Sequence, residues 1–134
     1  MMRSNGAPAP VDFYHAMIYV TDVGRSIRFY ELLGLEVIET RPGYARLRFP
    51  SGVGTVALHE PDAGSNRSVQ APGIRLYFEV QDLARYCEEL AARGVVFDEP
   101  PARRDWGWTH AYLRDPDGHE LSLFYAGRNR IQPE

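Results

Sequence analysis

Apolar residues recur along the chain at two alternating spacings, one typical of strands and one typical of helices. Residues 15–20 alternate as in a strand, and apolar residues at helical spacing then run up to Gly34, which favours a helix end. Three more short runs typical of strands follow at residues 36–40, 44–49 and 55–59, punctuated by Pro-Gly and Ser-Gly pairs. The pattern therefore predicts a βαβββ module.

The same order of elements returns in the second half of the chain. Three residue types repeat at an offset of 60 positions, in the pairs Val20 and Val80, Asp22 and Asp82, and Gly34 and Gly94. Each aspartate is expected to cap a helix. Further strands are expected at 74–80, 95–98, 109–114 and 120–125, with a hairpin turn at Asp115-Pro116-Asp117-Gly118. These elements predict an α+β protein of two tandem βαβββ modules, residues 13–60 and 74–125.

The segments outside the modules differ from them in composition. Residues 61–73 are rich in Asp, Gly, Ser, Asn and Pro and are interpreted as a linker. Residues 1–11 predict a flexible N-terminal arm and residues 127–134 a polar C-terminal tail, which leaves a single domain at 12–126. Neither module alone has two apolar layers, so we expect the modules to pair, within one chain or between two.

Composition and charge narrow the classes of function. The 134 residues, 44% hydrophobic and 25% charged, are typical of one globular domain. A formal charge of −3 disfavours electrostatic binding of nucleic acid. No run approaches the length of about 20 apolar residues that spans a bilayer, and no secretory signal is visible. The single cysteine, Cys87, lies on a helical apolar stripe and is expected to be buried. We expect a cytoplasmic protein that binds neither nucleic acid nor membrane.

Two segments of the chain resemble a known superfamily. The opening HAMIYVTDVGRSIRFYELLGLEV and the closing LRDPDGHELSLFY are similar to the vicinal oxygen chelate superfamily. That group includes glyoxalase I, extradiol dioxygenases, and the fosfomycin- and bleomycin-resistance proteins. The resemblance implies that the two modules form a curled mixed sheet around a cup, with the helices on the convex face and the ligand in the concave one.

The resemblance also implies four positions for metal ligands, on the first and fourth strand of each module. In this chain those positions hold His15, Ala57, Arg75 and Ser122. Only the histidine is a good ligand, because arginine has no lone pair to donate and alanine has no donor atom. We therefore expect no metal or other cofactor. A regrouped metal site is the alternative, built from His15, His59, His110 and Glu120.

Strand parity predicts which side chains face the cup, because alternate residues of a strand share a face. The segment Trp106-Gly107-Trp108 is similar to the part of bleomycin-resistance proteins that flanks the ligand groove. The candidate ligand-binding residues are His15, Tyr19, His59, Arg75, Tyr77, Trp106, Trp108, His110, Tyr112, Glu120 and Ser122.

Structural roles compete with several of these assignments. Arg75 is alternatively paired with Glu79 or Glu120, and His59 and His110 alternatively lie in water at strand ends. Indole rings suit flat or cationic ligands, whereas Arg75 and the two further arginines Arg46 and Arg48 favour an anionic ligand. The charge of the ligand therefore stays open at this point.

The leading hypothesis is metal-independent binding of a small aromatic or polar molecule, such as the sequestration of an antibiotic. The alternative is a lyase, isomerase or dioxygenase of the same superfamily, working through the regrouped metal site or through a histidine or Glu120 as a base. A third possibility is an accessory domain with a structural cup. We expect a homodimer, because two chains can complete two cups.

Overall fold

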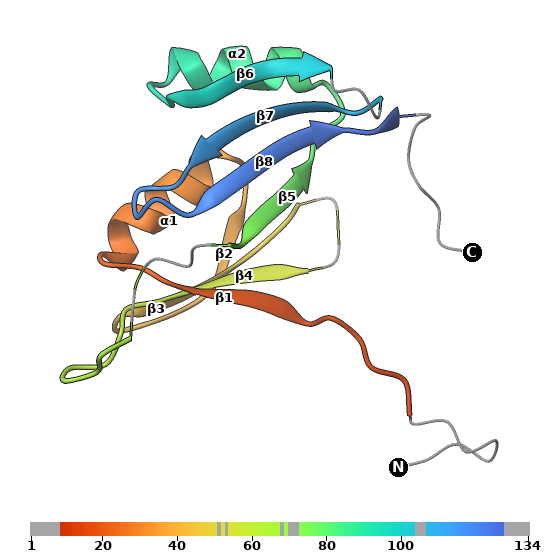
Figure 1. Cartoon of the computed structure of the whole chain (residues 1–134). Coiled ribbons are helices and arrows are strands. Elements are labelled where there is room, and N and C mark those ends of the chain that lie inside the picture. Colours follow the sequence, from red (N-terminus) through yellow and green to blue (C-terminus); the bar gives the residue numbers. More distant parts are fainter. Residues whose placement is uncertain are drawn as a thin grey trace.

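The computed structural model describes residues 9–50, 52, 54–67, 69, 73–103 and 107–127. Its elements follow the βαβββ order twice (Figure 1). Module 1 contains β1 (His15–Tyr19), α1 (Val23–Leu32), β2 (Glu36–Arg41), β3 (Tyr44–Arg48) and β4 (Thr55–His59). Module 2 contains β5 (Arg75–Glu79), α2 (Leu83–Ala92), β6 (Phe97–Arg103), β7 (Thr109–Arg114) and β8 (Glu120–Tyr125).

Each module forms its own four-stranded mixed sheet. The strand order is β1-β4-β3-β2 in module 1 and β5-β8-β7-β6 in module 2. In both sheets the first and last strands of the module pair in parallel, and the remaining pairs are antiparallel. No strand pairing among the described residues joins the two sheets, so they do not close into a barrel. The predicted α+β class and the tandem modules are confirmed.

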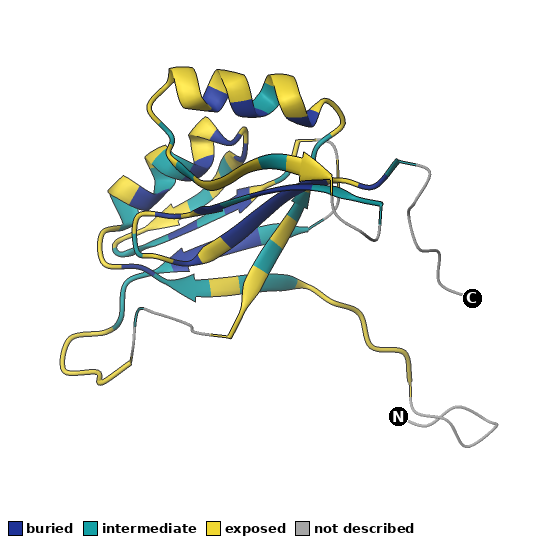
Figure 2. Cartoon of the chain, turned by 45° about the horizontal axis from the view of Figure 1, so that its top comes forward, coloured by how far each residue is buried: buried dark blue, intermediate teal, exposed yellow. Residues whose placement is uncertain are grey.

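Both helices begin at the aspartates that the repeat predicts as caps. The carboxylate of Asp22 accepts a hydrogen bond from the backbone N–H of Arg25 at 3.1 Å, and Asp82 accepts one from Arg85 at 3.5 Å. These bonds satisfy N–H groups that have no partner within the helix. Figure 2 shows that the buried positions of both helices lie on the side turned towards the sheets.

One face of each sheet builds the hydrophobic core. Alternate residues of the strands point towards the helices and are buried, so the period of two that marks the strands also defines this face. The buried side chains of both modules belong to one continuous cluster, which includes Tyr30, Leu47, Leu58, Leu90, Leu113, Leu121 and Leu123. The opposite face of each sheet, called its outer face below, therefore remains available for binding.

Strand β6 differs from its predicted bounds. A strand was expected at 95–98, whereas β6 runs from Phe97 to Arg103 and contains Pro100 and Pro101. Proline has no backbone N–H to donate and is confined to edge strands and bulges. Strand β6 is the edge of its sheet, and its pairing with β7 shifts register twice. An edge strand with such register shifts can therefore contain two prolines, which are otherwise typical of irregular segments.

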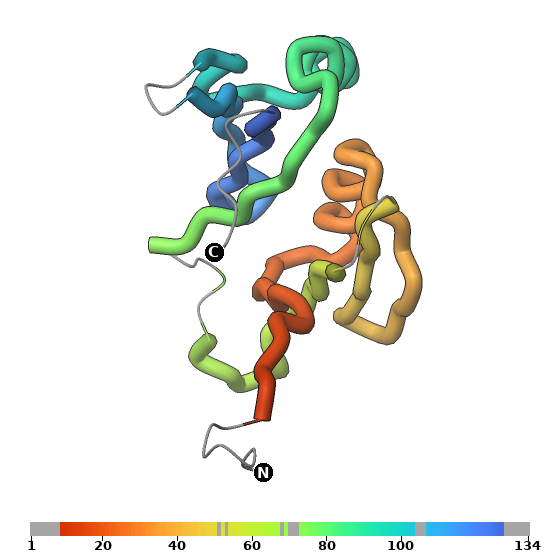
Figure 3. The backbone as a smooth tube through the Cα atoms, turned by 90° about the vertical axis from the view of Figure 1, so that its right-hand side faces the viewer, coloured from red at the N-terminus to blue at the C-terminus, as the bar shows by residue number. Residues whose placement is uncertain are grey.

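The turn between β7 and β8 fastens module 2 to module 1. Asp115, which was expected only as a turn residue, is buried and accepts a hydrogen bond from the hydroxyl of Tyr30 in α1 at 2.8 Å. Its other carboxylate oxygen accepts from the backbone N–H groups of Asp117 and His119, at 3.0 and 2.8 Å. Figure 3 shows α1 at the boundary between the two modules.

Further contacts of this turn reach the segment around the start of α1. Asp117 accepts hydrogen bonds from the backbone N–H of Thr21 and from Nη2 of Arg25, both at 3.1 Å. The imidazole Nε2 of His119 lies 2.8 Å from the carbonyl oxygen of Tyr19. Together these bonds hold the last hairpin of the chain against the first helix.

The buried hydroxyl of Tyr30 remains protonated and is therefore available as a hydrogen-bond donor. Loss of solvent, and then the negative charge of Asp115, raise the pKa of Tyr30 well above the usual value for tyrosine. The hydroxyl therefore keeps its proton and donates a hydrogen bond to the carboxylate throughout the neutral range. A hydrogen bond from a neutral donor to a buried carboxylate is stronger than one between two neutral groups.

We predict that Tyr30→Phe weakens the fold. The substitution removes the donor and leaves the Asp115 carboxylate buried with one bond fewer. We expect the free energy of unfolding to fall by about 1–3 kcal/mol, measured by urea denaturation at neutral pH.

Tyr125→Phe provides the control, because Tyr125 is exposed at the end of β8. Its loss should stay within about 0.5 kcal/mol. Equal stability changes in the two variants would show that the Tyr30–Asp115 bond does not hold the modules together.

Candidate functional site

Strand pairing places the predicted ligand-binding residues of module 2 on its outer face. Arg75 lies opposite Glu120, and Tyr77 lies opposite Ser122, across β5 and β8. Ser122 lies in turn opposite Tyr112 across β8 and β7. These residues therefore share one face of the sheet, as strand parity predicts, whereas Trp106 lies outside the described residues.

A ladder of aromatic rings crosses the outer face of module 2. It consists of Trp108, which directly precedes β7, His110 and Tyr112 of β7, and Phe124 of β8. The Trp108 and Phe124 rings are stacked, with centroids 4.8 Å apart and planes inclined by 9°. His110 stacks on Trp108 at 5.8 Å and on Tyr112 at 5.6 Å. In these four side chains, called the aromatic ladder below, the rings stack on one another; His110 and Phe124 are buried, and Trp108 and Tyr112 are partly exposed.

Tyr77 stands beside the ladder on the neighbouring strand β5. Its ring meets His110 edge-on at 5.7 Å and Phe124 at 5.9 Å. Tyr77 is exposed, whereas the ladder residue Phe124 beside it is buried. Such a combination of flat and perpendicular rings is suited to a planar ligand.

A serine on the neighbouring strand is hydrogen-bonded to His110. Its Nδ1 lies 2.7 Å from Oγ of Ser122 and shares a hydrogen bond with it. The two residues are 1% and 0% exposed, so the alternative of a water-exposed His110 is wrong. This buried bond sets the orientation of the imidazole ring within the ladder, so Ser122 acts on the site through His110.

An ion pair closes one end of the ladder. Arg75 donates from Nε and Nη2 to Oε1 of Glu120, at 3.1 and 2.9 Å, and its guanidinium lies 4.5 Å from the centroid of the Tyr112 ring. The hydrogen bond to Glu120 raises the pKa of Arg75. The structural pairing of Arg75 with Glu120 that the sequence left open is therefore present, and it adds a polar end to an aromatic surface.

The outer face of module 1 carries a second group of candidates. Tyr19 and His59 lie opposite each other across β1 and β4, with ring centroids 6.0 Å apart. Tyr44 of β3 contacts the other side of His59 at 5.7 Å. His15 lies two residues before Met17 on the same face, opposite Thr55. The contacts described for these residues connect them to one another and not to the aromatic ladder.

The donor set does not fit the metal site that the resemblance implies. Arg75 is engaged by Glu120, Ser122 is buried against His110, and Ala57 offers no donor. Within one copy of the chain the regrouped alternative is not assembled: among the described residues no three His, Cys, Asp or Glu side chains lie close enough to hold a metal ion. His110 and Glu120 belong to module 2, whereas His15 and His59 belong to module 1.

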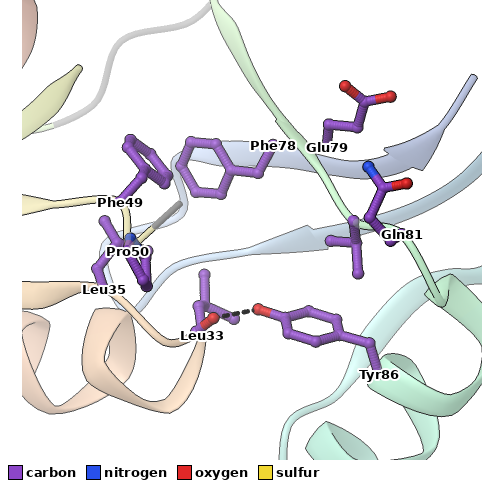
Figure 4. A pocket seen from close by; sticks show the side chains of 9 residues that line it. Leu33, Leu35, Phe49, Pro50, Phe78, Glu79, Gln81 and Tyr86 are labelled. Carbon is purple, nitrogen blue, oxygen red and sulfur yellow. Dashed lines mark hydrogen bonds between the residues drawn. The ribbon is translucent and has the colours of Figure 1, made fainter. Parts of the chain in front are cut away.

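A separate cavity of about 260 Å³ lies between the modules, near the C-terminal end of α1 (Figure 4). Its walls include Leu33, Phe49 and Phe78, and the two phenylalanine rings meet edge-on at 5.0 Å. The hydroxyl of Tyr86 donates to the carbonyl oxygen of Leu33 across the module boundary. The cavity contains no predicted ligand-binding residue and is distinct from the outer faces.

The single cysteine does not contribute a nucleophile. Cys87 is buried in α2, and burial raises the pKa of its thiol to about 11. The reactive form is the thiolate, which is scarce at neutral pH for such a group. The expectation of a buried structural cysteine is confirmed.

Comparison with known proteins identifies the fold. A model of the Glyoxalase/Bleomycin resistance protein/Dioxygenase superfamily matches residues 12–123. No curated protein matches the sequence significantly. No helix within the described part of the chain has the length and apolar character needed to cross a membrane.

Several solved structures have the same fold. A glyoxalase/bleomycin resistance protein/dioxygenase from Nocardioides is 24% identical, with a TM-score of 0.74 over 94% of this chain and 91% of that chain. A superfamily member from Sphaerobacter thermophilus DSM 20745 is 26% identical, with a TM-score of 0.71 and coverages of 87% and 98%. Lactoylglutathione lyase from Agrobacterium tumefaciens is 20% identical, with a TM-score of 0.68 and coverages of 87% and 94%.

Proposed function

The chain belongs to the glyoxalase/bleomycin resistance protein/dioxygenase superfamily, and from this premise we propose that it binds a small aromatic or polar molecule without a metal ion. The ligand lies on the outer faces of the sheets, which the core leaves open. Within this function the finer proposal is sequestration of a planar antibiotic, as a form of antibiotic resistance.

The aromatic ladder is the observation that carries this proposal. Rings from two neighbouring strands are aligned in nearly parallel planes, with 9° between Trp108 and Phe124 and 17° between His110 and Tyr112. Each stacked aromatic pair contributes about 0.5–1.5 kcal/mol beyond the area that it buries. The partly exposed rings of Trp108 and Tyr112 and the exposed ring of Tyr77 are the ones that a planar ligand can contact.

The chemistry around the ladder favours binding over metal-assisted catalysis. The side chains at the implied ligand positions are committed to other roles, such as the Arg75–Glu120 ion pair and the Ser122–His110 bond. Arginine cannot act as a ligand because it carries no lone pair at neutral pH. The residues of this site offer stacking, hydrogen bonds and charge, which are the features of a binding surface.

We further propose that a second copy of the chain completes the cup. In the described part of the chain, strands β1 and β5 each lie at an edge of their sheet, and apolar side chains on both are exposed, with Met17 at 41% and Tyr77 at 50%. Exposed edges and apolar surface of this kind invite pairing with another chain. A homodimer would bring the outer face of module 1 of one copy against that of module 2 of the other.

We predict that Trp108→Ala impairs ligand binding. Removing the indole takes away the first ring of the ladder. The binding free energy for quinone-type or aromatic glycopeptide antibiotics, measured by calorimetric titration, should weaken by roughly 1–3 kcal/mol. Trp108→Phe keeps a stacking ring and should retain most of the affinity.

The proposal fails if the unmodified protein binds none of these compounds at high micromolar concentration. It also fails if the two Trp108 variants lose the same amount, because the loss would then not depend on stacking.

We predict a dimer in sedimentation analysis. The expected mass is about 30 kDa, twice the 15.2 kDa of one chain. Met17→Glu places a charge on the outer face of edge strand β1 and should shift the protein to the monomer.

Ile38→Glu is the matched control, because Ile38 is 45% exposed on the opposite edge strand β2 and should leave the dimer intact. A monomer for the unmodified chain, or equal effects of the two substitutions, would contradict the proposed arrangement.

A further inference from the structure

Three arginines from β2 and β3 lie on the outer face of module 1, and two of them are matched by a carboxylate. Nη2 of Arg48 lies 2.6 Å from Glu36, and Nη2 of Arg41 lies 2.7 Å from Glu39. The described ionic partner of the third arginine, Arg46, is Glu39, which also pairs with Arg41. Nε of Arg46 lies 3.9 Å from Oε1 of Glu39. The charge of Arg46 is therefore the least compensated of the three.

The neighbour that Arg46 does have is a neutral phenol. Its Nη1 donates to the hydroxyl of Tyr14 at 2.8 Å, and its guanidinium lies 5.6 Å from the centroid of the same ring. A guanidinium binds a carboxylate more strongly than a hydroxyl, because the charges attract and two N–H groups can donate in parallel. Tyr14 is 69% exposed and precedes β1, so little packing holds it in this position.

Two buried nitrogen atoms beside Tyr14 have no hydrogen-bond partner among the described residues. They are Nε of Arg46 and Nδ1 of His15. The His15 ring also packs against Tyr14, with centroids 4.8 Å apart. Buried polar nitrogens normally have a partner, and both of these belong to side chains that contact the exposed ring of Tyr14, so we infer a place for an acceptor group where that ring now lies.

Arg46 shares one row of the sheet with Met17, Ala57 and Glu39. Arg46 lies opposite Ala57, whose methyl group is the smallest side chain in that row of the sheet. Along the same strands, two residues further, lies the aromatic group of Tyr19, His59 and Tyr44. Two residues of a strand span roughly 7 Å, so the arginine and the rings are separated by about the length of an aryl-propanoate.

We propose that the ligand is an aromatic carboxylate, whose anionic group displaces the hydroxyl of Tyr14 from Arg46. This inference rests on the proposed function and adds the charge of the ligand. The carboxylate accepts hydrogen bonds from Arg46, and His15 lies beside it. The aromatic part extends towards Tyr44 and His59, where it is covered by the aromatic ladder of the second copy.

The test uses the full chain and isothermal titration calorimetry. It compares three probes that share a naphthyl group and a three-carbon chain and carry an anionic, a neutral or a cationic end group. They are 3-(2-naphthyl)propanoate, the corresponding amide, and 3-(2-naphthyl)propan-1-amine. The carboxylate should bind at least about tenfold more tightly than the amide, and the amine should bind most weakly. Tyr14→Phe removes the competing hydroxyl and should tighten binding of the carboxylate without changing that of the amide.

Arg46→Gln should abolish the preference for carboxylate over amide while leaving the amide bound. Arg48→Gln is the control, because it removes an arginine of the same strand that has its own partner Glu36. The preference should survive in that variant. Near-ultraviolet circular dichroism of both variants checks that each is folded.

The possible failures are distinguishable. Equal affinity for carboxylate and amide, or equal effects of Arg46→Gln and Arg48→Gln, would overturn this inference while leaving aromatic binding intact. Stronger binding of the amine would overturn it in favour of a cationic ligand. Failure of all three probes to bind the unmodified protein would overturn the proposed function together with the inference.

Discussion

The buried carboxylate of Asp115 is the point on which the arrangement of the two modules depends. It accepts hydrogen bonds from the Tyr30 hydroxyl of module 1 and from two backbone N–H groups of its own turn. A buried carboxylate is costly unless its oxygens are bonded, so the turn must dock on α1 to be stable. That docking turns the helix-facing sides of both sheets into one core.

A consequence is that both helices pack on the core side of the sheets, away from the outer faces. In module 2 this face holds the aromatic ladder with the Arg75–Glu120 pair at one end, and in module 1 it holds Arg46 among aromatic rings. Of the four positions where the superfamily resemblance implies metal ligands, Ala57 offers no donor, Arg75 is paired with Glu120, and Ser122 is bonded to His110. These side chains are the basis of the proposal that the protein recognises an organic ligand directly.

Much of this could be predicted from the sequence, because its signals are local. The 60-residue offset established the repeat, and strand parity assigned Tyr112 and Ser122 to the same face. The second role of Asp115 was missed, because a turn sequence does not reveal which helix the turn contacts. The importance of Tyr14 was missed for a similar reason: it lies outside the alternating strand, and its contact with Arg46 joins residues 32 positions apart.

Metal analysis of the purified protein tests the central claim most directly. The protein should be expressed in medium containing iron, manganese, nickel and zinc, purified without tag or chelator, and examined by elemental mass spectrometry after dialysis. The account predicts only trace metal, and ligand binding that is unchanged by a chelator. Near-stoichiometric metal that survives dialysis would contradict it, because a site of His and carboxylate ligands would then have to form where this structure places stacking groups and arginines.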